Sequence, residues 1–178
     1  IDNLNIFFDV GAHEGESINL FLKNLQIKKI ISFEASPINY KKLMQKQMYF
    51  SKKFKDTEII IENIALGSIN KTVEFNQFKE SSSSTINKIN RDSRYFKRKF
   101  RVLNFSSSKK DIYKTIQINV EILKDYLLKN NINKVDFLKI DTEGYEYEVL
   151  KGLQNKIQAI STIMFEHHYD NMIKKNYT

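Results

Sequence analysis

The chain has 178 residues, enough for one domain with a buried core, and its hydrophobic fraction of 41% with 12% aromatic residues excludes a disordered protein. Cysteine is absent, which excludes disulfides and thiolate metal sites, and no apolar run is long enough for a membrane span. The net charge of +8 does not exclude a class of function, because a basic protein can have either a solvated basic surface or a polyanion-binding site.

The first strong signal is a short apolar run, residues 5–10, which breaks into a glycine-containing turn at residues 11–15. The run is typical of a strand buried on both faces, and the residues after the turn predict an amphipathic helix from Glu16 to Leu25. Glycine lets the backbone approach a ligand closely, and a helix start offers unpaired N–H groups. We therefore expect a site for a small polar ligand at this turn.

Asp9 ends the first strand, and this acid narrows the choice of ligand. A carboxylate sits badly beside a pyrophosphate, and the turn has neither the Gly-x-Gly-x-x-Gly spacing nor the Gly-Lys-Ser/Thr ending of phosphate-binding loops. A cofactor that carries positive charge suits it better, and S-adenosylmethionine, with its sulfonium and amino groups, is the natural candidate. A structural turn without a ligand is the alternative for this stretch alone.

The second predicted strand, residues 28–34, ends in another acid, Glu34. A strand–helix–strand unit implies a parallel pair with a right-handed crossover, so Glu34 should face the same crevice as the glycine turn. An acid about twenty residues after such a turn is placed to accept hydrogen bonds from both ribose hydroxyls. A solvated carboxylate at the strand end is the alternative.

A second helix is expected from Pro37 to about residue 54, with Ser36 as its N-cap. Its expected core contacts are Tyr40, Leu43, Met44 and Met48. The third predicted strand, residues 58–63, delivers Asn63 toward the adenine or the polar tail of the cofactor. Residues 71–78 alternate as an additional strand, which we expect to be antiparallel.

Regular signals fade over residues 79–114, which is typical of a lid, a binding insertion or a disordered segment. This stretch holds the densest basic cluster, residues 91–101. A solvated basic surface is favoured for this cluster, so nucleic acid is not the expected partner, and a polyanion site is kept as the alternative.

Strands are next predicted over residues 115–120, 135–140 and 160–165, with helices at 121–129 and after residue 145. This alternation predicts an α/β fold with a mostly parallel central sheet and helices on both faces. Parallel strands bring their carboxyl ends to one edge of a sheet. We therefore expect one site to gather four strand-end acids: Asp9, Glu34, Asp141 and Glu166.

Methyl transfer from a sulfonium needs mainly positioning and, for a hydroxyl acceptor, a base. The candidate catalytic bases are Asp141, Glu143 and His167. Asp141 is alternatively a cofactor contact or, with Glu143 and Glu166, a ligand of Mg²⁺ or Ca²⁺, so a divalent cation stays open and no metal ligand is assigned. For His167 and His168 the alternative is a partly buried pair hydrogen-bonded to the strand end.

Four ordered motifs resemble the FkbM-type methyltransferases. They are DVGAHEG at 9–15, FEASP at 33–37, NIALG at 63–67, and LKIDTEGYE at 138–146 followed by VLKG at 149–152. The resemblance runs from the first strand to Glu166 and His167. It implies a Rossmann-like, S-adenosylmethionine-dependent enzyme that usually methylates oxygen, with sugar hydroxyls and polyketide-type products among the family's substrates.

The resemblance also implies cofactor contacts, position by position. They are Asp9, Gly11, Ala12 and Gly15 at the methionine end, Glu34 at the ribose, and Asn63 with Ala65 at the adenine. Ser82 and Ser83 resemble a family serine pair near the cofactor. His13 departs from the family by standing where Asn is commoner, and Lys124 departs by replacing an acid. The closing strands of the fold are missing before Thr178, so we expect a domain that is incomplete or was cut from a longer chain.

Together these signals predict a single methyltransferase domain over residues 1–178, with residues 79–114 as an insertion or lid. The expected activity is S-adenosylmethionine-dependent O-methylation of a hydroxyl on a glycan or small metabolite, in the cytoplasm. One alternative is a methyltransferase or binding module for RNA or another polyanion. Another is a catalytically inactive module that binds a nucleotide or a partner.

Overall fold

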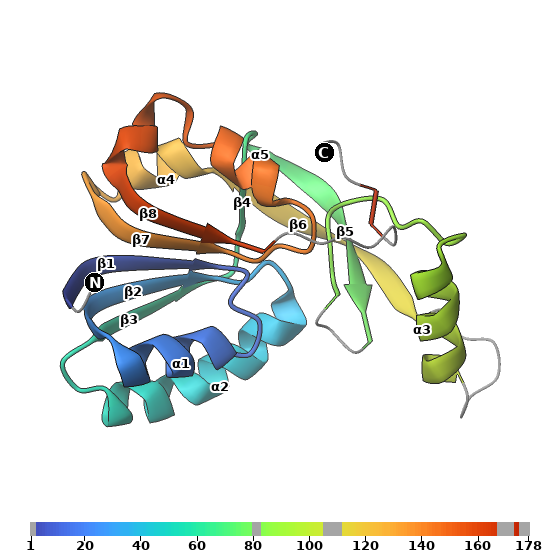
Figure 1. Ribbon diagram of the computed structural model, residues 1–178, viewed down its shortest axis with the longest axis horizontal. Helices are drawn as coiled ribbons and strands as arrows, with labels where there is room; N and C mark the ends of the chain where they lie inside the picture. Colours follow the sequence, from blue (N-terminus) through green and yellow to red (C-terminus); the bar gives the residue numbers. More distant parts are fainter. Residues whose placement is uncertain (1–2, 80–82, 105–111, 167–172, 175–178) are drawn as a thin grey trace.

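The centre of the molecule is a five-stranded sheet of order β3-β2-β1-β7-β8 in which each neighbouring pair is parallel (Figure 1). The computed structural model describes residues 3–79, 83–104, 112–166 and 173–174. The strands are β1 (Asn3–Val10), β2 (Gln26–Phe33), β3 (Glu58–Glu62), β7 (Val135–Ile140) and β8 (Ile160–Phe165). The predicted Rossmann-like arrangement is confirmed.

Helices cover both faces of this sheet. α1 (Glu16–Asn24) and α2 (Pro37–Lys53) lie on one face, while α4 (Leu123–Lys129) and α5 (Glu146–Lys151) lie on the other (Figure 1). Successive side chains of a strand point to opposite faces, so Phe7 joins the core cluster of α1 and α2, whereas Phe8 packs edge-on against Tyr126 of α4. Both faces of β1 are therefore buried, as its apolar run predicts.

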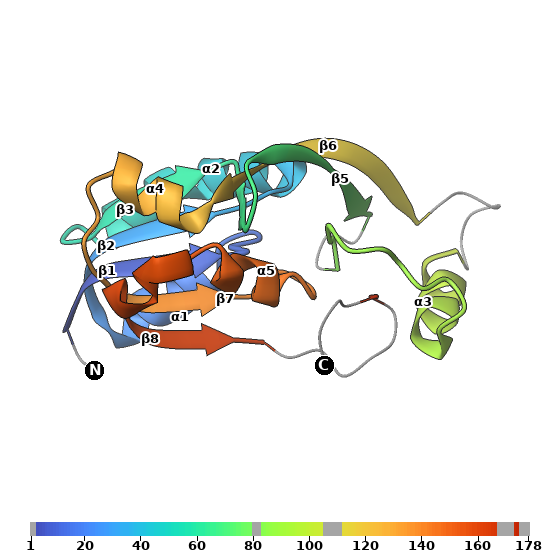
Figure 2. The same cartoon turned by 90° about the horizontal axis from the view of Figure 1, so that it is seen from above.

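A second, smaller sheet has the order β4-β6-β5. β5 (Lys71–Phe78) runs antiparallel to β6 (Tyr113–Ile122), which confirms the additional antiparallel strand, and β4 (Ala65–Gly67) runs parallel to β6. The strand β4 was not predicted. β6 continues to Ile122, so the helix predicted at residues 121–129 begins two residues later, at Leu123. α3 (Arg94–Asn104) lies beyond the far end of β5 and β6, away from the five-stranded sheet (Figure 2).

Two side chains predicted as core contacts of the second helix are exposed instead. Met44 is 37% exposed and Met48 68%. On α2, Leu43 and Phe50 already face the sheet, and the helical repeat turns Met48 away from it. The predicted N-cap of α2 is confirmed, because Ser36 Oγ accepts a hydrogen bond from Asn39 N at 3.2 Å.

The strand order reverses at β1, whose two neighbours are β2 on one side and β7 on the other. In open α/β sheets the crevice outside the carboxyl ends of the strands at such a reversal is the usual ligand site. The chain leaves β7 through the short helix α5 and then a 3₁₀ helix (Gln154–Ala159), which leads into β8. The fold therefore brings the strand-end acids to one place.

Candidate active site

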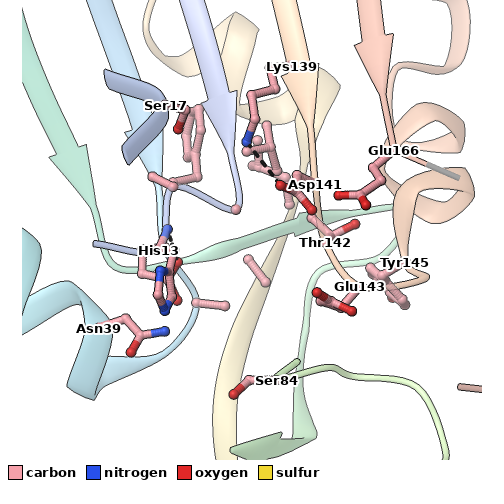
Figure 3. A pocket seen from close by; sticks show the side chains of 18 of the residues that line it. His13, Ser17, Asn39, Ser84, Lys139, Asp141, Thr142, Glu143, Tyr145 and Glu166 are labelled. Carbon is pink, nitrogen blue, oxygen red and sulfur yellow. Dashed lines mark hydrogen bonds and ion pairs between the residues drawn. The ribbon is translucent and has the colours of Figure 1, made fainter. Parts of the chain in front are cut away.

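A cavity of about 580 Å³ opens at the carboxyl ends of the central strands (Figure 3). This volume is in the usual range for small-molecule sites. One wall comes from the glycine turn, α1 and the start of α2, and the facing wall comes from the loop after β7 together with Glu166 after β8. The second sheet and the segment that follows β5 close a third side with Ala65, Leu66, Phe75, Ser84 and Ile86.

Acidic side chains dominate the charge of this cavity. Among the described residues that line it, carboxylates are supplied by Glu16, Glu34, Asp141, Glu143 and Glu166, and an ammonium group by Lys139 alone. The chain as a whole carries a net charge of +8, so the cavity is a local concentration of negative charge on a basic protein. Such a site attracts cationic ligands and disfavours anionic ones.

Asp9 does not line the cavity but lies behind it, with none of its surface exposed. Ser17 Oγ donates a hydrogen bond to Asp9 Oδ2 at 2.6 Å, and Lys139 Nζ lies 3.1 Å from Asp9 Oδ1. A buried carboxylate requires partners of this kind. The cation that this strand-end acid meets is thus the chain's own lysine, and Asp9 orients Lys139 and Ser17.

Lys139 joins the tips of β1 and β7. Its Nζ also lies 3.5 Å from Asp141 Oδ2, so one ammonium group connects a fully buried acid to an acid in the cavity wall. Burial by itself lowers the pKa of Lys139, but the carboxylates of Asp9 and Asp141 outweigh it and hold the pKa above its usual value. Lys139 therefore keeps its charge and fixes the position of Asp141.

The glycine turn shapes the cavity without presenting a row of N–H groups to it. Gly11 N and Ala12 N both donate to Phe33 O, at 2.9 and 3.1 Å, so these amides tie the turn to the end of β2. Gly11 and Ala12 line the cavity, whereas Gly15 does not. A Cβ atom on Gly15 would lie 2.8 Å from Leu43 Cδ1, so this glycine serves the packing of α1 on α2.

Glu34 lines the cavity and is only 6% exposed. Its Oε2 accepts a hydrogen bond from His13 N at 2.7 Å, and its Oε1 accepts one from Ser36 N at 2.8 Å. Burial raises the pKa of Glu34 to about 7, although the backbone N–H groups of Ser36 and His13 act to lower it. The Asn39 side chain also hydrogen-bonds this carboxylate, which keeps acceptor capacity for a ligand hydroxyl.

Of the other residues predicted near the cofactor, some line the cavity and others lie outside its lining. Ala65 lines the cavity, whereas Asn63 uses its Nδ2 to donate to Glu34 O at 2.8 Å and lies outside the lining. Ser83 is buried outside the lining, and its neighbour Ser84 lines the cavity. Ser82, His167 and His168 lie outside the described residues.

The loop after β7 carries Asp141 and Glu143 and is held by two sets of hydrogen bonds. The Oε1 atom of buried Glu146, at the start of α5, accepts hydrogen bonds from Thr142 N at 3.0 Å and Gly144 N at 2.9 Å. Thr85, in the segment after β5, donates from its Oγ1 to Glu143 O at 2.7 Å. Glu143 has a φ of 52°, a backbone conformation that needs such support in a residue other than glycine.

The family profile described as Methyltransferase FkbM domain matches residues 9–176, nearly the whole chain. The chain belongs to the FkbM methyltransferase family. The crystal structure of the methyltransferase FkbM from Methylobacillus flagellatus KT has the same fold, with a TM-score of 0.54 and 17% sequence identity. The match covers 88% of this chain and 30% of that chain, so the present chain spans less than a third of that protein's length. No curated protein matches the chain.

For an FkbM methyltransferase domain, the acidic cavity is the candidate active site. Within the described ranges, no group of three His, Asp or Glu residues is arranged to hold a metal ion. No helix in the part of the chain that the structure describes is long and apolar enough to cross a membrane.

Sequence reasoning missed Lys139 and Ser17 as parts of this FkbM site. A lysine inside the apolar strand 135–140, two residues before Asp141, was an available signal. A charge in a buried strand needs a partner, and residues two apart point to the same side of a strand. Ser17 gave no comparable signal, because serine is common in the first turn of a helix.

Proposed function

We propose that the chain is an S-adenosylmethionine-dependent O-methyltransferase that acts on a hydroxyl of a glycan or small metabolite. The observation that carries this proposal is the acidic cavity at the strand reversal of an otherwise basic FkbM domain. The lysine among its described lining residues, Lys139, already pairs with Asp9 and Asp141, which leaves the other carboxylates to attract the sulfonium and amino groups of the cofactor.

The residues of the cavity fit this cofactor. The Glu34 carboxylate lines the cavity where it can accept from a ribose hydroxyl, and the apolar side chains of Ala65 and Leu66 offer a surface for the adenine ring. Gly11 and Ala12 would contact the methionine end. The bound cofactor supplies a methyl group on a cationic sulfur, and every other requirement of the reaction falls to the protein.

Asp141 is the best placed of the described candidate bases. It lines the cavity, and Lys139 anchors its Oδ2 atom, so the carboxylate has a fixed position. Asp141 would accept the proton of the acceptor hydroxyl as the oxygen gains its methyl group, a role that requires hydrogen-bond contact with that hydroxyl. Glu143 lies in the same loop and is the second candidate, and His167 stays a prediction from the sequence.

Calorimetry with S-adenosylmethionine tests the cofactor directly. The wild-type chain should bind it, and Glu34→Ala should weaken binding by about 1–3 kcal/mol through loss of charge-assisted hydrogen bonds. Glu74→Ala is the matched control, because Glu74 is an exposed acid of β5 outside the cavity. Absence of binding by the wild-type chain would refute the proposal.

The acceptor class is tested by mass spectrometry. Candidate glycans and small hydroxylated metabolites are incubated with S-adenosylmethionine that carries an isotopically labelled methyl group, with and without chelator. We expect the label on an oxygen of the product and equal transfer in the presence of chelator. Label on nitrogen or carbon would contradict O-methylation, and loss of transfer on chelation would show that a metal takes part.

A further inference from the structure

The segment around α3 has a charge opposite to that of the cavity. Residues 85–104 contain seven Lys or Arg residues and a single acid, Asp92. α3 lies beyond the far end of the second sheet, well separated from the central sheet in both views (Figures 1 and 2). The molecule therefore has an acidic cavity in its centre and a basic surface toward one end.

Part of this basic surface is concave. A hollow of about 280 Å³, which we call the basic hollow, is lined by Arg91, Phe96, Lys97, Phe100 and Arg101. Phe96 is buried in a cluster with Phe78 and Ile112, and it anchors α3 to the second sheet. The ring of Phe100 is stacked near that of Phe96, with centroids 6.1 Å apart, and is 39% exposed. The hollow thus combines an aromatic surface with three cationic side chains.

Two cationic side chains of the basic hollow differ in how firmly the protein holds them. Arg91 Nε donates to Tyr113 OH at 3.0 Å, and the guanidinium lies over the Tyr113 ring, which orients the side chain. Lys97 Nζ lies 3.7 Å from Asp92 Oδ1, but both side chains are largely exposed, so this ion pair is weak. A carboxylate or phosphate would form stronger, charge-assisted hydrogen bonds with these groups.

One continuous segment connects the cavity to the basic hollow. Ser84 and Ile86 line the cavity, and Arg91 lines the hollow. Five residues of fully extended chain span at most about 18 Å, which limits the distance between the Cα atoms of Ile86 and Arg91. Thr85 and Asn87 attach this segment to the loop after β7, the proposed catalytic loop, through Glu143 O and Gly144 O. A single extended molecule can therefore reach both places.

We propose that the basic hollow binds an anionic group at one end of an oligosaccharide acceptor, whose other end presents a neutral hydroxyl in the cavity. This inference rests on the proposed O-methyltransferase function and specifies its substrate class. The anionic group is a carboxylate or a phosphate, and the exposed ring of Phe100 provides a surface for a sugar ring.

The charge pattern favours such an acceptor over RNA or another uniform polyanion. A polyanion that extends from the basic hollow into the cavity would place phosphates beside Glu16, Glu143 and Glu166. Between Ile86 and Arg91 the sequence offers one cation, Lys88, whereas nucleic-acid grooves follow the backbone with a track of positive charge. The two opposite charges of this molecule suit a ligand that is anionic at one end only.

The test uses tetrasaccharides that differ at one end. Maltotetraose is neutral, maltotetraonic acid carries one terminal carboxylate, and maltotetraose 1-phosphate carries one terminal phosphate. Binding to the full chain is measured by calorimetry at saturating S-adenosylmethionine. At least one anionic tetrasaccharide should bind about tenfold more tightly than maltotetraose, and comparison of the two identifies the preferred anion. Oligouridylate serves as the nucleic-acid probe.

Two double variants that each remove two positive charges test whether the preference for an anionic tetrasaccharide comes from the basic hollow. Lys97→Gln with Arg101→Gln removes two cations of the basic hollow and should abolish the tenfold preference for the anionic tetrasaccharide. Arg94→Gln with Arg98→Gln removes two exposed cations of the same helix that do not line the hollow, and affinity should stay within twofold. Circular dichroism should show the same helix content in both double variants.

Contrary results can refute this inference alone or the proposed function with it. Equal losses in both double variants, no preference for an anionic tetrasaccharide, or tighter binding of oligouridylate would each overturn the inference. A titration with S-adenosylmethionine alone separates it from the proposed function. If the cofactor binds and the preference is absent, only this inference fails, whereas failure of cofactor binding removes the proposed function itself.

Discussion

A Cβ atom on Gly11 would lie 1.8 Å from the carbonyl oxygen of Asp141. The turn after β1 and the loop after β7 therefore meet with no room for a side chain between them. Asp141 N also donates to Val10 O at 2.9 Å, so the contact continues the pairing of the two strands. This close approach fixes the two walls of the cavity relative to one another.

Gly11→Ala should destabilise the fold by about 3 kcal/mol or more, because the new methyl group meets backbone atoms and because Gly11 has a φ of 82°. The measurement is urea unfolding followed by circular dichroism. Asn131→Gly is the control: Asn131 has a φ of 54°, and glycine there should leave stability within about 1 kcal/mol. A Gly11→Ala variant as stable as the wild type would show that the two loops separate easily.

Glu34 should make stability depend on pH between about 4.5 and 7. Burial raises its pKa from 4.5 to about 7, so the folded state holds the proton more tightly than the unfolded state does. This contribution to stability is fully present below pH 4.5 and is lost as the pH rises through 7, a decrease of about 3 kcal/mol. Urea unfolding of the ligand-free chain between pH 4 and 8 measures it, and Glu34→Gln should remove this part of the slope.

Cofactor affinity should change with pH in the opposite direction. The ionised Glu34 is the better acceptor for ribose hydroxyls, so affinity for S-adenosylmethionine should rise between pH 6 and pH 8. The same titrations on Glu34→Gln should give weaker binding with little change over this range. A wild-type affinity that is constant from pH 6 to 8 would remove Glu34 from the ribose assignment.

Lys139→Met should destabilise the protein by about 3–5 kcal/mol, because it leaves the fully buried carboxylate of Asp9 without its cation. Adding Asp9→Asn should recover about 2 kcal/mol or more, since a neutral amide no longer requires that partner. Lys29→Met is the control, because its ion pair with Glu58 is partly exposed and its loss should cost less than about 1 kcal/mol. Independent effects in the double-mutant cycle would contradict the coupling of Asp9 and Lys139.

Substitution of the two described acids of the catalytic loop should identify the base. Asp141→Asn should reduce kcat by at least about 100-fold while S-adenosylmethionine still binds, since general-base catalysis contributes about 10²–10⁴ in rate. Glu143→Gln should reduce kcat by less than tenfold. The assay is transfer of the labelled methyl group to the acceptor found by mass spectrometry. The reverse order of the two variants would assign the base to Glu143.

Thr85→Val should cost about 1–2 kcal/mol, because it removes the hydroxyl that donates to Glu143 O in a fully buried position. Thr115→Val removes an exposed hydroxyl that donates to Asn76 on the second sheet and should cost less than about 0.5 kcal/mol. Thermal unfolding compares the two. Equal costs would show that Thr85 does not support the catalytic loop.

The succession of central strands and helices along the chain was predictable because each central strand is a clear apolar run, and an acid was expected at the end of four of the five. Asp141 and Glu34 were predicted as site residues for this reason, and both line the cavity. The support of the site was not predictable, because it depends on contacts between distant parts of the sequence. No local pattern shows that Lys139 pairs with Asp9, or that Thr85 reaches Glu143. β4 was missed because three residues are too few for a period to be recognised.

Thr85 and Asn87 bond to main-chain oxygens of the loop after β7 and not to its side chains. Every sequence that keeps the same backbone path offers the same two oxygens, so residues 83–104 can be exchanged for the counterpart of another FkbM protein if those two attachments are retained. If this segment binds the acceptor as proposed, a chimera of this kind should acquire a new acceptor preference while Glu34 and the glycine turn stay untouched. Under the proposed acceptor site, a change of acceptor then requires no change in the residues proposed to hold the methyl donor.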